Sequence, residues 1–377
     1  MFIKIDPLDT LFFRDGRPFT MGEDDWIESL FPPSPGVLYG ALRSLYFAHH
    51  PNELPMALRE NDPTAGLSLK LIYWLVGNQE KNQRVYFPLP LECVKAKEIK
   101  EKKGFPYRLR VLHQPKDTAI SCPLPWILRH EEEEEIEAPE NCLLDEDALA
   151  EYLSGEREEF SALELNDYVL SEPKVGIGRN PYTLTAEKHK LYRFQLSRLK
   201  ELSLGVEYKG LELPEKGLMR LGGEGKGVVY HHLEGKTFSR PPLPEKESSK
   251  YFKLYLITPA FFAQGWLPGW LKENGQNKIW IGEYKGLQLQ LLAAAIGKPQ
   301  SIGGFNMHHD KKGPKEMRRA VPAGSIYYFE LLKGDLKEVE QCFHGQSISE
   351  FRPQEGFGIA FVGLLSKKSL AALKAGD

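Results

Sequence analysis

The residues best suited to phosphate chemistry lie in a glycine-rich stretch, Leu221–Val228, which reads LGGEGKGV. Its Gly225-Lys226 pair is typical of a nucleotide-binding P-loop. However, Arg220 stands where that motif needs its first glycine, and Gly227 replaces the Ser or Thr that would hold magnesium. Nucleotide hydrolysis is therefore not indicated. Backbone amides in this loop could still hold an RNA phosphate beside Lys226, or the glycines could simply let the backbone pack closely against a sheet.

Histidines supply the other candidates for catalysis. His308-His309-Asp310 could bind a divalent ion, since imidazole and carboxylate groups are both metal ligands, but no further His/Asp series in a helical context accompanies it. His231-His232 and His189 could serve as general acid and base in RNA cleavage, although a histidine in a polar segment is more often a surface residue. The sequence therefore favours a protein that is not an enzyme, and it indicates no metal and no cofactor.

A longer stretch, Pro7–Ser44, places arginines beside a predicted helix start. Met1–Asp9 alternates side chains like an opening strand, and the bend that follows it contains Arg14 and Arg17. Further on, Ser34 is placed to cap a helix whose first position is occupied by proline. The amino end of a helix attracts anions, so this stretch predicts a phosphate site; an ordinary capped core helix is the alternative.

The amino-acid sequence of this stretch, together with several later motifs, resembles that of one family of CRISPR proteins. The matching motifs are Pro7-Leu8-Asp9, Leu11–Phe19 (LFFRDGRPF), Phe31–Pro35 (FPPSP), Gly40–Ser44 (GALRS), Val175–Arg179 (VGIGR), Leu191-Tyr192, Leu221–Gly225 (LGGEG), Ile302-Gly303-Gly304 and Ala320–Ser325 (AVPAGS). They follow the family's order and span almost the whole chain. The family is the subunit of the RAMP superfamily that caps the 5′ end of the guide RNA in type III-B (Cmr-module) complexes.

This resemblance implies a function. The chain would be a non-catalytic RNA-binding subunit that holds the repeat-derived 5′ tag of the CRISPR guide RNA. Its implied partners are the guide RNA, the large polymerase/cyclase-like subunit of the complex and the adjacent backbone RAMP subunit. A RAMP endoribonuclease that processes guide RNA with histidine as general acid/base is the alternative, and a scaffold without RNA contacts is a third hypothesis.

Composition sets further limits. The 377 residues are enough for two domains with buried cores, and 41% hydrophobic with 27% charged residues is typical of a globular protein. No apolar run is long enough to span a membrane and no signal peptide is evident, so we expect a cytoplasmic protein without membrane contact. The four cysteines are widely scattered, which favours neither a zinc site nor a disulfide framework.

Charge is unevenly distributed along the chain. The formal net charge is −3, yet Glu131–Glu172 contains 17 acidic residues and a single basic one, Arg157, for a net of −16. The rest of the chain therefore carries −3 + 16 = +13. A basic body is the expected footprint of an RNA-binding protein, and here an acidic insertion hides it in the overall sum.

Two charged segments have more than one interpretation. Lys95–Arg110 contains seven basic residues interleaved with aromatics, which is compatible with a surface for single-stranded RNA or with a solvated hairpin tip. Glu131–Glu137 is a near-continuous glutamate run that we expect to be solvated and mobile. After it, Asp145–Leu153 and Glu158–Leu165 are predicted to be helical. This acidic insertion could contact a protein partner or serve as a solubilising face.

The predicted fold is α+β, with two ferredoxin-like (RRM-like) βαββαβ domains that contain glycine-rich loops. Residues 1–245 would form the first domain, with the acidic helical insertion at about 95–175, and residues 246–377 the second. Pro241–Lys250 is the predicted linker. In the second domain we expect a strand at Tyr251–Thr258, a helix at Gly286–Ile296, short and long strands at Gln300–Asn306 and Gly324–Leu332, a helix at Leu336–Cys342 and a final strand at Phe357–Leu365.

The candidate RNA-binding residues share a basic side chain, a glycine backbone or a helix start. They are Arg14, Arg17, Ser34, Arg43, Arg179, Gly223, Gly225, Lys226, Lys311, Lys312, Arg318, Arg319, Gly356 and Gly358. Lys311, Lys312, Arg318 and Arg319 belong to the basic segment Lys311–Arg319. We expect the guide RNA to pass the helix start at Ser34 and the two glycine loops.

Overall fold

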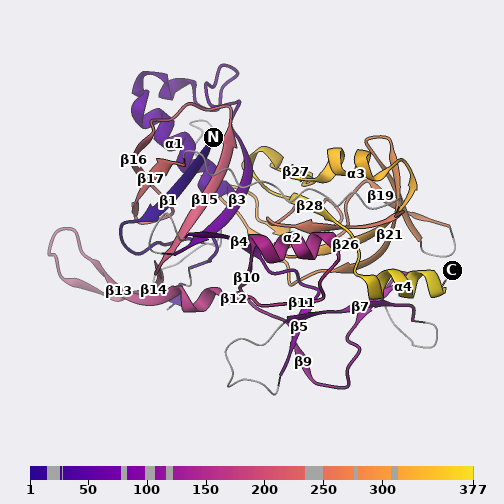
Figure 1. Ribbon diagram of the computed structural model, residues 1–377. Helices are drawn as coiled ribbons and strands as arrows, with labels where there is room; N and C mark the ends of the chain where they lie inside the picture. The colour runs from indigo at the N-terminus through magenta and orange to yellow at the C-terminus, as the bar shows by residue number, and fades with distance from the viewer. Residues whose placement is uncertain are drawn as a thin grey trace. The chain divides into compact units, whose positions relative to one another are not determined.

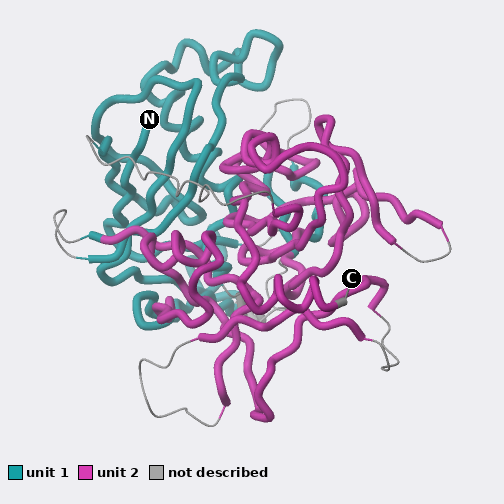
Figure 2. Tube along the Cα trace, turned by 45° about the vertical axis from the view of Figure 1, so that its right-hand side comes forward, with its two compact units in different colours: residues 1–83, 166–237, 301–319 teal, residues 84–165, 238–300, 320–377 magenta. Residues whose placement is uncertain are grey.

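The computed structural model describes residues 1–14, 26–27, 29–77, 83–97, 107–115, 122–233, 249–275, 279–306 and 313–376. These residues form two compact units, each assembled from three stretches of chain (Figure 2). Unit 1 contains residues 1–83, 166–237 and 301–319, and unit 2 contains residues 84–165, 238–300 and 320–377. The sequence suggested two consecutive domains instead, and most of its predicted linker lies outside the described residues.

Unit 1 is built on an antiparallel sheet in the order β3-β15-β1-β17-β16 (Figure 1). Its strands are β1 (Phe2–Pro7), β3 (Ser68–Val76), β15 (Leu202–Lys209), β16 (Lys216–Arg220) and β17 (Gly227–His232). The central strand β1 pairs with β15 on one side and β17 on the other, so that Ile3 lies between Val206 and His232. The opening strand predicted from the sequence is therefore confirmed.

Helix α1 (Pro35–His49) packs against β3 and β16 of this sheet. It buries Leu38, Leu42 and Leu45, which recur at the helical spacing visible in the sequence. The short helix η1 (Pro51–Met56) follows it. Ser34 occupies the N-cap position with an extended backbone, as predicted, but its side chain makes no capping hydrogen bond. The first turn instead begins with proline, which needs no hydrogen-bond partner for its nitrogen.

A long hairpin of β13 (Val169–Arg179) and β14 (Ala186–Leu199) extends from unit 1, and β2 (Trp26–Ile27) pairs in parallel with β14. Phe194 and Leu196 pack on Phe12 from one face of this hairpin. The motif Val175–Arg179 belongs to the first strand of this hairpin, and the chain reverses between Asn180 and Thr185. The remaining short strands are β22 (Gln300–Ile302), β23 (Phe305–Asn306), β24 (Gly313–Pro314) and β25 (Arg318–Ala320).

Unit 2 contains an antiparallel sheet in the order β19-β20-β21-β26-β18-β28-β27. Its strands are β18 (Tyr251–Leu256), β19 (Leu271–Asn274), β20 (Ile279–Tyr284), β21 (Leu287–Ala295), β26 (Ile326–Lys333), β27 (Gln346–Ser347) and β28 (Ile359–Gly363). Helix α3 (Leu336–Phe343) begins with a capping box between Asp335 and Glu338 and buries Val339 and Phe343. The first strand, this helix and the last strand were predicted from the sequence.

The helix predicted at Gly286–Ile296 is not formed, because this stretch is strand β21. Leu287, Leu289 and Leu291 are buried and alternate with glutamines, and β21 pairs with β20 and β26. The run of alanines that follows fits both the helical and the strand period, so periodicity alone could not distinguish a helix from a strand here. The mixture of helices and strands agrees with the predicted α+β class, but the described residues between β18 and β26 contain no helix that could be the first one of a βαββαβ order.

Most of the predicted acidic insertion, up to Leu165, lies in unit 2, and residues 84–165 of this unit contain mostly short strands. They are β4 (Arg84–Pro88), β5 (Cys93–Ala96), β6 (Tyr107–Leu109), β7 (Val111–His113), β8 (Ile127–Arg129), β9 (Ile136–Glu137), β10 (Cys142–Asp145), β11 (Glu159–Phe160) and β12 (Leu163–Glu164). Helices α2 (Glu146–Ser154), η5 (Pro353–Glu355) and α4 (Lys367–Gly376) complete the unit, and the short helix η3 (Leu165–Asp167) begins at the end of this stretch and continues into residues of unit 1. None of the helices in the described part of the chain has the length and apolarity to cross a bilayer.

The two predicted helices of the insertion have different outcomes. Helix α2 is confirmed: Asp145 accepts a hydrogen bond from the amide of Ala148 at 2.9 Å, and Gly155 ends the helix in the left-handed conformation. The second prediction, at Glu158–Leu165, was wrong. Phe160 is fully buried and pairs in β11 with Tyr107 of β6, so a partner distant in the sequence decided the local structure.

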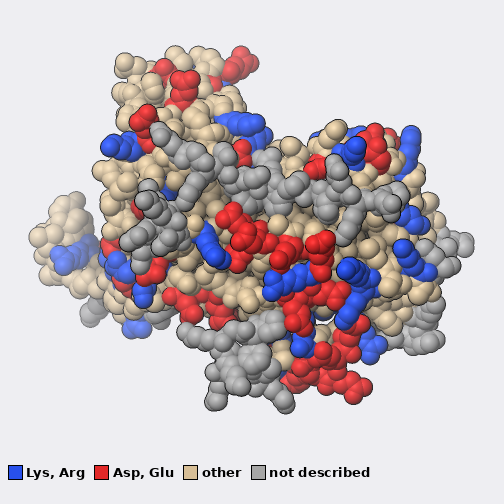
Figure 3. Space-filling model, viewed as in Figure 1, with Lys and Arg blue, Asp and Glu red and all other residues tan. Residues whose placement is uncertain are grey.

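The glutamate run is exposed, as expected, but it is also held by ordered contacts. Strand β9 pairs with β5, and glutamates of the run form ion pairs with basic residues from three other elements of unit 2. These pairs are Lys97–Glu135 at 2.9 Å, Arg108–Glu132 at 2.5 Å, Lys95–Glu137 at 3.3 Å and Lys368–Glu131 at 2.5 Å. Figure 3 shows acidic and basic side chains interleaved on the lower part of this face. The run is therefore an arm packed on unit 2, which we call the acidic arm (Glu131–Glu137).

A buried ionic cluster lies at the centre of unit 2. The ammonium group of Lys253 is 3.1 Å from the Glu92 carboxylate and lies 3.5 Å from the centre of the Tyr152 ring. The hydroxyls of Tyr152 and Tyr328 donate to the same carboxylate. Burial lowers the pKa of Lys253, and the neighbouring carboxylate opposes this shift. Burial also raises the pKa of both tyrosines, which stay neutral donors.

We expect Lys253→Met to lower the free energy of unfolding by about 3–5 kcal/mol, because it leaves the Glu92 carboxylate buried without its counter-ion. The double variant Glu92→Gln, Lys253→Met should cost less than the sum of the single changes. Chemical denaturation of the two single variants and the double variant measures both quantities. Additive losses would contradict a coupled buried pair.

Replacing Glu131, Glu132 and Glu135 of the acidic arm by glutamine should change the free energy of unfolding by less than about 1 kcal/mol. Exposed ion pairs contribute little, because solvent screens them and the long side chains lose entropy. Denaturation at low and high salt checks this expectation. A large loss of stability at low salt would mean that the arm is an essential part of unit 2.

Candidate nucleic-acid interface

The candidate interface in unit 1 is organised around the segment Thr10–Phe13, which other elements hold from two sides. Leu11 and Ser197 of β14 exchange two backbone hydrogen bonds, of 2.7 and 2.9 Å. On the other side, the amide of Gly223 donates to the carbonyl of Phe12 at 2.8 Å. The segment is thereby fixed between the hairpin and the glycine turn that joins β16 to β17.

The glycine turn closes with a hydrogen bond of 2.9 Å from the amide of Leu221 to the carbonyl of Lys226. Gly222 has a φ of 79°, and a Cβ at this position would lie 2.4 Å from the carbonyl oxygen of Phe12, so packing requires glycine there. Gly225 differs. Its φ is 64°, but the space beside it is open. Both glycines are exposed, but only Gly225 has free space around its Cα, so a ligand could approach its backbone from that side.

Lys226 is directed at the start of the central segment. Its ammonium group donates to the hydroxyl of Thr10 at 2.8 Å and lies 3.7 Å from the Asp9 carboxylate. Arg198 binds Asp9 at 2.8 Å and also pairs with Glu172. A hydrogen bond from the Thr10 amide and one from Arg198 lower the pKa of Asp9, and Arg198 likewise lowers the pKa of Glu172. Both carboxylates therefore stay charged at neutral pH, and Lys226 and Arg198 are partly neutralised.

The start of α1 is connected to the same segment. The carbonyl of Phe13 accepts a hydrogen bond of 2.7 Å from the amide of Leu30, and the amide of Phe13 donates to the Ser29 hydroxyl at 3.1 Å. The rings of Phe13 and Phe31 are 6.2 Å apart. These contacts bring the residues before Ser34 next to the central segment. Four of the predicted residues, Arg14, Gly223, Gly225 and Lys226, thus lie in or beside one network of contacts, which also includes the residues just before the helix start.

Other predicted residues lie on unit 1 outside this contact network. Arg179 is exposed near the end of β13. Arg319 is exposed on β25, while Arg318 pairs with Glu316 at 2.7 Å. Arg17, Lys311 and Lys312 lie outside the described residues, as does His308-His309-Asp310.

Three predicted residues have roles within the fold. Arg43 forms an ion pair of 2.5 Å with Asp62 and donates to the Thr64 hydroxyl at 2.7 Å, so it fastens α1 to the loop that follows η1. Gly356 and Gly358 are buried in unit 2. The amide of Gly358 donates to Pro259 at 2.7 Å, and a Cβ there would lie 2.6 Å from the amide nitrogen of Ser349. The structure therefore supports the packing alternative for Gly358.

The outer face of the β13–β14 hairpin is a candidate surface that was not predicted from the sequence. Val175 is 58% exposed and pairs with the exposed Arg193, and Ile177 pairs with the exposed Leu191. At the tip, Tyr182 is 93% exposed. Aromatic, apolar and basic side chains together are typical of surfaces for unpaired nucleotides. In the sequence LYRFQLSR (Leu191–Arg198), alternate side chains of a strand point to opposite faces. This alternation was the signal from which the exposed face could have been predicted.

The basic segment Lys95–Arg110 receives less support as an RNA surface. Its described residues Lys95, Lys97 and Arg108 are already paired with glutamates of the acidic arm, and Arg108 also pairs with Glu159 at 3.1 Å. Arg110 donates to the carbonyl of Leu91 at 2.9 Å. The lysines at its centre lie outside the described residues. The described part therefore carries little unpaired positive charge.

Histidines provide little support for catalysis within the described residues. His232 lies 3.3 Å from the hydroxyl of Tyr208, and burial lowers its pKa, which favours the neutral imidazole. The side chain of His189 is not described. His130, Glu132 and Glu134 bring their donor atoms within 4.8 Å of one another, but Arg108 already pairs with both glutamates. A cation there would have to compete with a guanidinium group.

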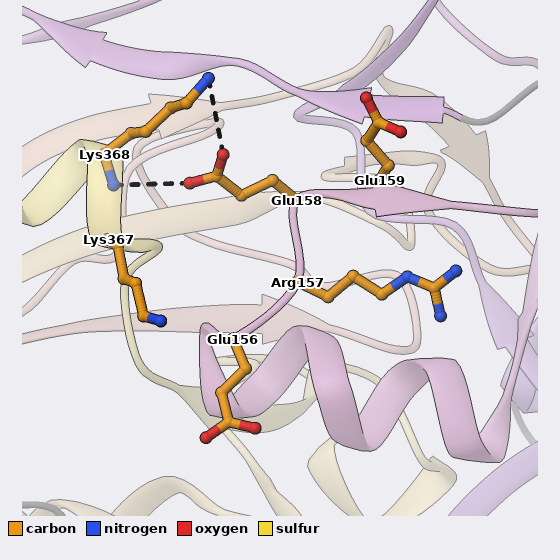
Figure 4. A pocket seen from close by; sticks show the side chains of 6 residues that line it. All are labelled: Glu156, Arg157, Glu158, Glu159, Lys367 and Lys368. Atoms are coloured by element: carbon orange, nitrogen blue, oxygen red, sulfur yellow. Dashed lines mark hydrogen bonds and ion pairs between the residues drawn. The ribbon is translucent and has the colours of Figure 1, made fainter.

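Unit 2 has an open pocket of about 570 Å³. It is lined by Glu156, Arg157, Glu158, Glu159, Lys367 and Lys368 (Figure 4). The Glu158 carboxylate reaches both the amide and the ammonium group of Lys368 and so occupies the amino end of α4. Carboxylates and cations alternate around the pocket, so its charge selects no particular ligand.

Comparisons with known proteins identify one family. The model of the CRISPR-associated protein family Cas_Cmr3 matches residues 3–365. No curated protein matches the chain. Among solved structures, a chain of the type III-B Cmr-beta complex bound to cognate target RNA and AMPPnP is 16% identical, with a TM-score of 0.49 and coverage of 87% of this chain and 86% of that chain. A chain of the same kind of complex bound to cognate target RNA is 17% identical, with a TM-score of 0.49 and the same coverage.

The two glycines Gly225 and Gly358 allow a matched test, because both have positive φ but only one is enclosed. We expect Gly225→Ala to cost about 1–2 kcal/mol, from the left-handed backbone alone. Gly358→Ala should cost clearly more, since its Cβ also meets the backbone of Ser349. Equal losses in chemical denaturation would contradict this difference between the two loops.

Proposed function

The chain belongs to the Cas_Cmr3 family of CRISPR-associated proteins, and we propose that it is a non-catalytic RNA-binding subunit of a type III-B CRISPR effector complex. In this role it holds the repeat-derived 5′ tag of the guide RNA. It docks the large polymerase/cyclase-like subunit and the adjacent backbone RAMP subunit. The motifs shared with the family along almost the whole chain support this proposal.

One observation carries the proposal: the glycine turn, the residues that lead into α1 and Arg14 all adjoin the segment Thr10–Phe13. Open backbone at Gly225 and the partial positive charge at the start of α1 both favour a phosphate. Arg14 is exposed at the end of the segment. A chain of phosphates that follows this segment would find backbone donors and a basic side chain in sequence.

The hairpin β13–β14 adds a second kind of contact. Tyr182 at its tip and Arg193 on its outer face can stack on unpaired bases, which phosphate contacts alone cannot recognise. In this proposal, the segment Thr10–Phe13 orients the RNA backbone and the hairpin contacts bases. The acidic arm of unit 2 repels RNA and so favours binding on unit 1.

Incubation of the purified protein with repeat RNA tests the proposed function. We expect the RNA to be retained intact, with or without magnesium, manganese or zinc, because the described residues offer no convincing metal site. Gel electrophoresis of the RNA and filter binding give the two readouts. Cleavage that is lost in His231→Ala, His232→Ala would support the endoribonuclease alternative, and absence of both binding and cleavage would support a scaffold.

The affinity for repeat RNA should fall steeply with salt, since phosphate contacts release counter-ions. The triple variant Arg14→Ala, Arg179→Ala, Arg319→Ala should reduce the slope of log K against log salt by roughly 2, at about 0.7 for each phosphate contact. A matched control removes three exposed lysines of unit 2, Lys272, Lys333 and Lys337, with the same change in net charge. Equal losses in the two triple variants would argue against a specific surface on unit 1.

A further inference from the structure

The outermost strand of the unit 1 sheet, β16, has an unpaired edge. Among the described strands its one neighbour is β17. The register of this pair can be read at both ends: the amide of Leu221 donates to Lys226, and the amide of His232 donates to Glu215. Hydrogen-bonded positions therefore alternate through residues 215, 217, 219 and 221 of the first strand. At Lys216, Leu218 and Arg220 the backbone amides and carbonyls point away from the sheet.

The same three residues also present their side chains to solvent. Lys216 and Arg220 are exposed, and Leu218 between them is 66% exposed. Leu218 pairs with the half-buried Val229, and Leu8, itself 62% exposed, lies 3.5 Å from the position of a Cβ on Gly227, next in the ladder to Arg220. A small apolar surface thus continues from Leu218 toward Leu8. It is flanked by two cations.

From this edge we infer a docking site for an extended segment of a protein partner, which adds to the sheet beside β16. Backbone amides and carbonyls of Lys216, Leu218 and Arg220 would pair with the incoming strand. Side chains at alternate positions on that strand would meet the three exposed side chains. The complementary sequence is an acidic residue, any residue, an apolar residue, any residue and an acidic residue. This inference concerns a protein contact and does not depend on the proposed RNA binding.

Charge excludes a second copy of the chain as the occupant. If two β16 strands paired antiparallel about Leu218, Lys216 of one copy would face Arg220 of the other. Like charges directly opposite each other destabilise a strand pair. Basic residues on an exposed edge are a known protection against self-association. The same residues favour an acidic partner, so the edge discriminates between an acidic segment and a second copy of this chain.

The probe for this site is the acetylated and amidated peptide Thr-Asp-Thr-Val-Thr-Glu-Thr. Hydrogen–deuterium exchange of the full chain, read by mass spectrometry, should show slower exchange across residues 214–221 as the peptide is added up to millimolar concentration. A peptide with lysine in place of the two acidic residues is the control. No protection at saturating concentration of the acidic peptide, or equal protection by both peptides, would overturn the inference.

Two variants separate backbone pairing from charge. Leu218→Pro removes an outward amide that β17 does not use, a position where a sheet edge tolerates proline, and it should abolish the protection. Lys216→Glu, Arg220→Glu leaves the backbone intact. It should weaken binding of the acidic peptide by about tenfold or more and confer binding of the lysine peptide. Unchanged binding in the charge-reversed variant would contradict the site even if Leu218→Pro failed to fold.

Discussion

The pair of backbone hydrogen bonds between Leu11 and Ser197 fixes the path of the chain on which the candidate RNA surface depends. Once Leu11 is bound to β14, Phe12 must face both Phe194 and the glycine turn, and its carbonyl can accept the hydrogen bond from Gly223. The carbonyl of Phe13 then accepts the bond from Leu30 that brings the start of α1 alongside. Three distant parts of the sequence meet because one short segment satisfies the backbone of all of them.

The two units achieve their stability by different means. In unit 1, a sheet covered by α1 leaves a long hairpin and a glycine turn accessible, and two of its cations, Arg198 and Lys226, pair with Asp9 or Glu172. In unit 2, by contrast, the buried pair of Glu92 and Lys253 links several elements through two tyrosine hydroxyls. Such a pair contributes little net free energy but is costly to break. We therefore expect the pair to specify one arrangement of unit 2 more than it increases stability.

Local sequence signals were sufficient to predict helices whose first residues are themselves typical of a helix start. The helices predicted to begin at Pro35, Asp145 and Leu336 are all present in the structure. Strand β21 was misread because its partners β20 and β26, and not its own apolar run, determine its period. The acidic arm was expected to be mobile because its partners Lys97 and Arg108 precede it by tens of residues and carry no local mark. Non-local contacts of this kind cannot be read from spacing.

Non-local contacts also decide which candidate site residues are accessible and which are engaged within the fold. Arg14 and Gly225 were found by type, and they lie on an accessible surface of unit 1. Arg43 and Gly358 looked equivalent in the sequence, but Asp62 engages the first and Ser349 encloses the second. Arg193 was overlooked because its exposure follows from the pairing of β13 with β14 and not from any motif. Residue type thus indicated which residues could contact RNA, whereas the fold determined which of these arginines and glycines are accessible to a ligand.

Photo-crosslinking gives the most direct test of where the RNA lies. A guide RNA with 4-thiouridine at successive positions of its 5′ tag would be bound to the protein, irradiated and mapped by mass spectrometry. We expect crosslinks to residues 7–14 and 221–226 of unit 1, with contacts from the tip of the β13–β14 hairpin at neighbouring nucleotides. Crosslinks that fall instead on unit 2, around the acidic arm or α4, would contradict it.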